Sequence, residues 1–229
     1  TVQAGQILWG IDPDGNLMSD NYFGNQWYVQ IANSWSHTET YGLSPTDFDG
    51  EFRDWGVIGL SPSSTAGNLD SNYEITGVYD YTGTISDGTL NFTAGYLDIY
   101  IGDETLGTKD FNEDDSPDNI DGSYLGANTG TWIGRFLVTG GSGEIPASGQ
   151  IGTTEIDNID VVYVADDLLA GYWGYDADGD LNTTNDTIDL STVAFELTLG
   201  HSNTTSQSET AQRIDDELQE FYTVAKKPR

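Results

Sequence analysis

The sequence contains no cysteine and is poor in the groups that commonly carry catalysis. Without cysteine there can be no disulfide, no thiolate metal site and no thiol nucleophile. Its only histidines, His37 and His201, lie far apart and have no metal-ligand spacing. There is no Gly-x-Ser-x-Gly elbow, no His-Glu-x-x-His motif and no phosphate-binding glycine loop. We therefore expect no enzymatic activity, and a glycosidase with a chance pair of carboxylates is the one catalytic alternative.

Basic residues are also scarce. Seven lysines and arginines face 38 aspartates and glutamates, which gives a formal net charge of −31. Such a chain repels phosphate backbones and anionic lipids, so nucleic acids are excluded as partners. The same charge makes divalent cations natural partners, because self-repulsion otherwise opposes compaction and assembly. Adaptation to a salty habitat is an alternative explanation of the acidic composition, and both explanations can hold together.

Long hydrophobic runs are missing as well. No apolar run reaches the roughly 18 residues that a membrane-spanning helix needs, so we expect no membrane span. The sequence starts at Thr1 rather than at a methionine, as it would after removal of an export signal. These features lead us to expect a secreted protein that is extracellular or attached to a cell surface.

Alternation of apolar and polar residues with a period of two dominates the chain and predicts β-strands. It covers residues 26–32, 73–85, 90–94, 97–101, 132–138, 159–164 and 193–199. Residues 159–164 are apolar on both faces except at Asp160, which indicates a central strand. Clusters of Gly, Asp, Asn, Ser and Thr separate the runs, as turns require. The pattern predicts an all-β protein, an antiparallel β-sandwich or jelly roll, with residues 1–205 in a single domain.

The two ends of the chain carry separate predictions. Residues 206–224 lack Gly and Pro and place Ile214, Leu218 and Phe221 at helical spacing, ahead of a basic tail that ends at residue 229. This pattern predicts a short amphipathic helix. Residues 1–10 form an isolated strand-like segment. It could complete the sheet of a neighbouring copy by strand addition, or pair within its own sheet.

The strongest local signal is a nine-residue motif that occurs twice, at residues 9–17 and 173–181, with six identical positions. Both copies alternate side-chain oxygens around a glycine, and oxygen ligands converging on a tight turn suit Ca²⁺. The first loop offers Asp12, Asp14, Asn16 and Asp20, and the second offers Asp176, Asp178, Asp180, Asn182 and Asp186. Neither is an EF-hand, because the glycine is at the fourth position of the loop and no glutamate closes it. An Asp-rich β-turn without metal is the alternative.

Aromatic residues are the other candidate for a binding site. The six tryptophans and the tyrosines could form a platform on which sugar rings stack, or they could fill the core. A sandwich with no cysteine and one methionine needs most of its aromatics for packing, so core packing is the favoured interpretation. The tryptophans are Trp9, Trp27, Trp35, Trp55, Trp132 and Trp173.

Three stretches of sequence resemble a known group of exported proteins. They are residues 79–85 (YDYTGTI), 88–101 (GTLNFTAGYLDIYI) and 171–181 (GYWGYDADGDL). Together they are similar to the flocculation-associated members of the exosortase-sorted (PEP-CTERM) secreted proteins, over about residues 70–200. The resemblance implies an exported, β-rich protein of a matrix or floc with no known catalysis.

These observations lead to one function hypothesis and one alternative. The leading hypothesis is a secreted structural subunit of an extracellular filament or of a biofilm or floc matrix. It would associate with copies of itself through strand complementation and calcium. The alternative is an extracellular carbohydrate-binding, lectin-like module that binds matrix polysaccharide.

Overall fold

The computed structural model describes residues 8–12, 15–17, 29–41, 49–62, 73–87, 89–103, 126–144, 157–176, 187–192, 196–201, 212–214, 219–220 and 222–223. Within these residues every strand pairing is antiparallel, and the only helical element is one short 3₁₀ turn. The prediction of an all-β antiparallel protein is therefore confirmed.

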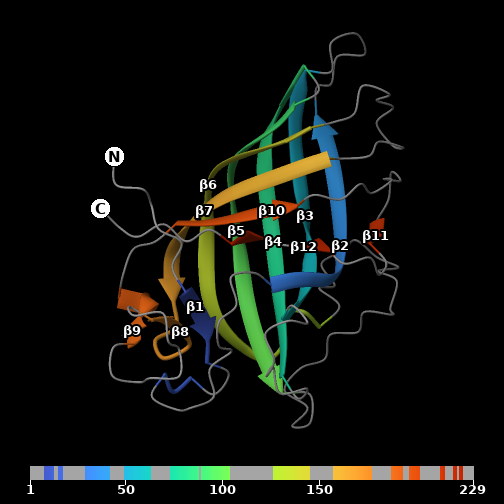
Figure 1. Ribbon diagram of the computed structural model, residues 1–229. Helices are drawn as coiled ribbons and strands as arrows, with labels where there is room; N and C mark the ends of the chain where they lie inside the picture. The colour runs from blue at the N-terminus through green and yellow to red at the C-terminus, as the bar shows by residue number, and fades with distance from the viewer. Residues whose placement is uncertain are drawn as a thin grey trace, which may run out of the picture.

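Most strands belong to one large sheet, and the remaining three form a small sheet beside it (Figure 1). The large sheet contains β2 (Val29–Tyr41), β3 (Gly50–Pro62), β4 (Tyr73–Ser86), β5 (Thr89–Asp103), β6 (Thr131–Glu144), β7 (Asp157–Leu168), β10 (Glu196–His201), β11 (Gln212–Ile214), β12 (Gln219–Glu220) and β13 (Tyr222–Thr223). Its order is β11-β2-β3-β4-β5-β6-β7-β10-β13, and β12 pairs with β2. The small sheet has the order β1-β8-β9, from β1 (Leu8–Ile11), β8 (Trp173–Asp176) and β9 (Thr187–Asp189), and the 3₁₀ turn η2 (Leu190–Thr192) follows it.

The hydrophobic core lies on the inner face of the curved large sheet, and the small sheet packs against part of it. Alternate residues of β4 to β7 point inward, and Phe136 and Tyr163 among them are at most 1% exposed. The small sheet and η2 add Ile11, Trp173 and Leu190 to the same cluster. Burial of this apolar face is the main stabilising contribution to the fold. The predicted face of residues 97–101 is confirmed, since Leu97, Ile99 and Ile101 are all buried.

Two β-bulges shift side chains to the face opposite the predicted one. Ala94 is exposed although the alternation placed it with buried Leu90 and Phe92, because the β4–β5 register shifts at Thr82 and Gly83. The alternation over residues 132–138 places Trp132 on the same face as Phe136 and Val138, but Trp132 lies on the outer face because the β5–β6 register shifts between Ile99 and Tyr100. An extra residue in one strand reverses the alternation beyond it. A single-strand pattern cannot reveal this, since a bulge depends on the partner strand.

Glycine makes the first of these bulges possible. Gly95 has a φ of +138°, and a Cβ placed there would lie 2.3 Å from the carbonyl oxygen of Asp80. Only a residue without a side chain fits such a close approach of two strands. The same geometry recurs between β6 and β7, where Gly141 has a φ of +142° and approaches the carbonyl oxygen of Asp160.

The C-terminal prediction was wrong where the structure describes the chain. Within residues 206–224 the described residues 212–214, 219–220 and 222–223 are strands rather than a helix. β11 and β12 pair with β2, whereas β13 pairs with β10 at the other end of the strand order. A short isolated helix is marginal in water, whereas an open sheet edge offers hydrogen bonds along its whole length. Pairing with the two edges therefore outweighs the helical periodicity.

The N-terminal segment pairs within its own chain where it is described. Strand β1 (Leu8–Ile11) is hydrogen-bonded to β8, and Ile11 is buried in the core. For these residues the structure agrees with the interpretation of a strand in its own sheet. Residues 1–7 lie outside the described residues.

The outer face of the large sheet is covered at one end. Val57 and Val78 form a second, small apolar cluster with Ala127, against which Tyr100 packs. The Thr76 hydroxyl donates a hydrogen bond of 2.5 Å to the Ala127 carbonyl oxygen, fixing residues 126–129 over this end. Beyond this cluster the outer face carries polar and aromatic side chains.

A buried tyrosine pair gives a first prediction. The hydroxyls of Tyr81 and Tyr163 lie 2.5 Å apart and are hydrogen-bonded. We expect Tyr81→Phe to lower the free energy of unfolding by about 1–3 kcal/mol, because it leaves a buried hydroxyl without that partner. Replacing both tyrosines by phenylalanine should restore most of this loss. A double-mutant cycle from urea unfolding measures the coupling, and strictly additive losses would contradict it.

The same pair predicts how stability depends on pH. Burial raises the pKa of both Tyr81 and Tyr163 above that of an exposed tyrosine. Both hydroxyls therefore stay protonated in the folded state while they ionise in the unfolded chain. Their contribution is complete below about pH 10 and is lost above it, by up to about 2.7 kcal/mol per pH unit for two protons. Urea unfolding between pH 8 and 11 tests this, with the double phenylalanine variant as control.

Candidate functional site

The first residues of the two copies of the nine-residue motif, 9–11 and 173–175, lie side by side as antiparallel strands. In the β1–β8 pair, Gly10 is opposite Gly174, and Ile11 is opposite Trp173. Each copy therefore starts opposite the third residue of the other copy, and a local twofold axis passes through the glycine pair. No sequence feature other than the repeat itself could have indicated this pairing.

This pairing separates the two candidate calcium loops. Because the strands are antiparallel, the loop that follows Ile11 and the loop that follows Asp176 leave the pair at opposite ends. Asp12 and Asp176 stand four register positions apart, which corresponds to about 13 Å along the strands. Asp12 and Asp176 consequently cannot bind the same metal ion.

The first loop begins with a turn that is packed into the protein. Asp12 is fully buried, its N–H donates to the Tyr172 carbonyl oxygen at 2.8 Å, and its carbonyl accepts from the Gly15 N–H at 3.3 Å. Gly15 has a φ of +73°, and a Cβ there would lie 2.7 Å from the Tyr172 ring. The glycine and the first aspartate of the motif therefore have a structural role, in addition to any role in metal binding.

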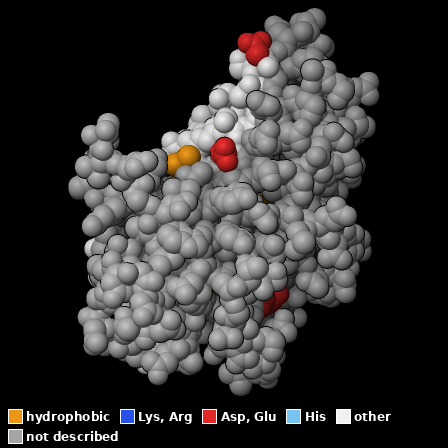
Figure 2. Space-filling model, viewed as in Figure 1, with side chains coloured by type: hydrophobic (Ala, Val, Ile, Leu, Met, Phe, Trp, Pro, Cys, Tyr) orange, Lys and Arg blue, Asp and Glu red, His pale blue; other side chains and the backbone are white. Residues whose placement is uncertain are grey.

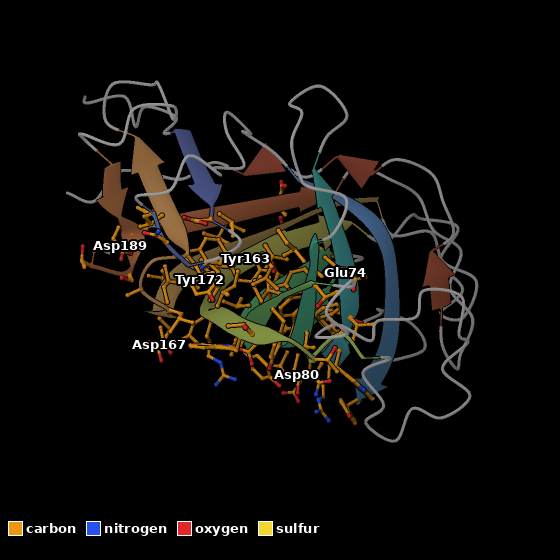
Figure 3. The ribbon with its side chains drawn as sticks, turned by 90° about the horizontal axis from the view of Figure 1, so that it is seen from below. Glu74, Asp80, Tyr163, Asp167, Tyr172 and Asp189 are labelled. Atoms are coloured by element: carbon orange, nitrogen blue, oxygen red, sulfur yellow. The ribbon has the colours of Figure 1, made fainter. Side chains whose placement is uncertain are left out.

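The segment that leads into the second copy is fixed by Asp189. One oxygen of its carboxylate accepts from the Gly171 N–H and the other from the Ser191 N–H, each at 2.9 Å. Gly171 has a φ of +90°, and a Cβ there would lie 2.2 Å from the Gly15 carbonyl oxygen. These contacts hold the first turn, the start of β8 and the end of β9 together. Figure 3 shows Tyr172 and Asp189 close to the small sheet.

Few of the predicted metal ligands are among the described residues. Asp12 is buried and Asn16 is exposed, and the backbone of Asp176 ends β8. Outside the described residues lie Asp14, Asp20, Asp178, Asp180, Asn182 and Asp186. Within the described part of the chain, no group of three or more His, Cys, Asp and Glu residues could hold a metal ion. The calcium sites therefore remain a prediction.

A second candidate site lies on the outer face of β3 and β4. The Nε–H and Nη2–H groups of Arg53 donate to the two carboxylate oxygens of Asp80, at 2.9 and 2.7 Å. The guanidinium carbon also lies 4.6 Å from the centre of the Trp55 ring. The two-pronged contact fixes the plane of the guanidinium, and the ring attracts its charge. Arg53, with 44% of its side chain exposed, remains accessible to a ligand.

The same combination occurs on the neighbouring strands β5 and β6. Arg135 donates to Asp98 through its Nε–H at 2.7 Å and its Nη2–H at 2.5 Å, and lies 4.6 Å from the centre of the Tyr96 ring. The Trp132 indole N–H donates to Asp98 at 3.3 Å. Hydrogen bonding to Asp98 raises the pKa of Arg135, although burial partly opposes this effect, so the guanidinium stays charged. Asp98 is only 8% exposed, whereas 42% of the Arg135 side chain is accessible.

The strand register places the Arg53–Asp80 pair and the Arg135–Asp98 pair, each with its aromatic ring, on one surface. Asp80 of β4 is directly opposite both Trp55 of β3 and Tyr96 of β5, and Asp98 is opposite Arg135. We call this surface the outer-face cluster and define it as Arg53, Trp55, Asp80, Tyr96, Asp98, Trp132 and Arg135. Figure 3 shows Asp80 on the outer side of the sheet and Tyr163 inside.

On the face seen in Figure 2, the described side chains at the surface include Asp or Glu but no Lys or Arg.

Sequence reasoning named Trp55 and Trp132 only within the set of all tryptophans. The structure buries Trp173 in the core and leaves Trp55 and Trp132 half-buried on the outer face. The scarcity of basic residues was the sequence signal that could have identified the cluster, because two of the seven basic residues, Arg53 and Arg135, occur in it. Their carboxylate partners are 27 and 37 residues away in the sequence, so only the sheet could identify them.

Comparison with family models, curated proteins and solved structures returns no match for this chain. The resemblance to exosortase-sorted secreted proteins accordingly stays a prediction. No helix in the described part of the chain has the length and apolarity needed to cross a membrane.

Proposed function

We propose that this protein is a secreted, non-enzymatic structural subunit of an extracellular filament or matrix that associates with copies of itself. The observation that carries the proposal is the continuous sheet. Five consecutive strands, β2 to β6, are 13 to 15 residues long, and each is hydrogen-bonded to the next. Such a sheet is a continuous hydrogen-bonded scaffold, which suits a structural subunit.

The charge and the small sheet support self-association. A net charge of −31 keeps isolated copies apart unless cations bridge them, which makes assembly depend on calcium. In the small sheet, β1 and β9 are the outer strands, and among the described residues each pairs only with β8. Outer strands are the natural place for strand addition between copies.

Electron microscopy of the natively purified protein, with and without a calcium chelator, tests this function. We expect filaments or a network in calcium that fall apart on chelation. Assemblies that persist after chelation would support the role as a structural subunit but would show that calcium does not hold the copies together. A monodisperse monomer in both conditions would overturn the proposal.

A calcium titration gives a sharper prediction. Since the two motif loops leave the β1–β8 pair at opposite ends, we expect two calcium ions per chain, falling to one in Asp178→Asn. Calcium at 100 times its dissociation constant should stabilise the fold by about 2.7 kcal/mol per site. Isothermal titration calorimetry and thermal unfolding measure both, with Mg²⁺ as the control ion. A single shared ion, or no heat of binding, would contradict the two-site prediction.

A further inference from the structure

We propose that the outer-face cluster binds a neutral polysaccharide. This inference goes beyond the structural role and does not depend on calcium or on self-association. It rests on a surface that combines half-buried aromatic rings, fixed hydrogen-bonding groups and balanced charge across four adjacent strands.

The first argument is the dimension and continuity of the cluster. Its residues come from the neighbouring strands β3, β4, β5 and β6. Three strand spacings of about 4.8 Å give about 14 Å across the sheet. The rows from Arg53 to Arg135 cover four residues along the strands, or about 13 Å. An open sheet face of this size suits an extended chain of sugar rings better than a small molecule, which binds in a concave pocket.

The second argument is the chemistry of the repeated unit. A sugar ring has an apolar C–H face and a rim of hydroxyls, so it is recognised by an aromatic ring next to fixed donors and acceptors. The cluster supplies this pair twice, as Trp55 with Arg53 and as Tyr96 with Arg135. Each guanidinium lies over one face of its ring, 4.6 Å from the ring centre, so a sugar would contact the opposite face or the edge of the ring together with the guanidinium. The two-pronged contacts with Asp80 and Asp98 hold each guanidinium in place before a ligand arrives. Preorganised groups lose less entropy on binding.

The third argument is the charge of the cluster, which decides the class of ligand. Two arginines balance Asp80 and Asp98, so the cluster is close to neutral in a protein whose net charge is −31. An anionic polymer or a phosphate would gain little from arginines that are already paired, and the rest of the molecule would repel it. An uncharged polyol encounters no such repulsion. A second copy of this acidic chain is disfavoured as the ligand of the cluster on the same ground, because the cluster has no surplus of cations to bridge the two copies.

Native affinity electrophoresis tests the proposal directly, because the high negative charge drives the protein through the gel. The probes are laminarin, hydroxyethyl cellulose and galactomannan as neutral polymers, and alginate as the anionic polymer. We expect at least one neutral polymer to retard the protein and alginate to have no effect. Trp55→Ala and Tyr96→Ala should each weaken the apparent affinity at least tenfold. Leu169→Ala, which truncates an exposed apolar side chain outside the cluster, is the matched control.

A second variant keeps the test valid if a ring deletion perturbs folding. Thr82 is exposed on β4, two residues from Asp80 and therefore on the same face. Thr82→Lys obstructs the surface without removing any ring, and it should also abolish retardation while thermal unfolding stays unchanged. Absence of retardation by all three neutral polymers would overturn the proposal. So would retardation that survives Thr82→Lys and both ring variants, or retardation by alginate alone.

Discussion

Replacing Trp173 by alanine is expected to lower the free energy of unfolding by about 3–5 kcal/mol, the largest effect of any single change considered for this protein. The Trp173 ring is 3% exposed and packs edge-on against Phe136, with 5.3 Å between ring centres. Its indole N–H donates to the Ile133 carbonyl oxygen at 2.6 Å. The substitution removes a large buried ring and leaves a cavity between the two sheets.

Denaturant unfolding in the presence of a calcium chelator measures this loss. Trp173 starts the second motif copy, so a loss of the same size with and without calcium would show that the residue stabilises the fold rather than a metal site. Trp55→Ala is the control, because Trp55 is half-buried on the outer face, and we expect it to cost much less. Equal losses for the two variants would contradict the assignment of Trp173 to the core.

Replacing Arg135 by alanine is expected to lower the free energy of unfolding far more than replacing Arg53 does. Both arginines donate to an aspartate through the same two nitrogens, Nε and Nη2. Removing Arg135 leaves the carboxylate of Asp98, which is 8% exposed, without its cation. Breaking a fully buried ion pair costs about 3–5 kcal/mol, and the half-exposed guanidinium reduces our expectation to about 2–4 kcal/mol. Asp80 is 24% exposed and water can solvate it, so Arg53→Ala should cost at most about 1 kcal/mol.

The comparison can be made by urea unfolding of Arg135→Ala and Arg53→Ala at low and high salt. High salt should reduce the loss of stability in Arg53→Ala further and leave the loss in Arg135→Ala almost unchanged, because buried charges are screened less. Similar losses for the two variants would show that burial of Asp98 does not control the energetics of the pair. Arg135→Lys should not rescue the loss, since an ammonium cannot reproduce the two-pronged contact.

Sequence periodicity predicted the central strands well, because one face of each packs on the core. In β4, buried Tyr79, Tyr81 and Ile85 alternate with Asp80, Thr82 and Thr84, which are exposed or half-buried, and this contrast is visible in the sequence alone. Strand β3 was not predicted, because Asp54 and Gly56 occupy inward positions and the apolar Trp55 and Val57 point outward, which breaks the alternation. The C-terminal segment was predicted as a helix, because its apolar spacing carries no information about the sheet edges it pairs with.

The sequence by itself determined the class of this protein: all-β, antiparallel, acidic, without disulfides, and with a repeated nine-residue motif. These properties follow from composition and from local periodicity, which each strand carries within itself. The tertiary structure decided how distant residues meet. It placed the two motif copies opposite each other, buried Trp173 while leaving Trp55 half-exposed, and joined Arg53 to Asp80 and Arg135 to Asp98. Such contacts depend on strand register and bulges, which arise only when strands pair.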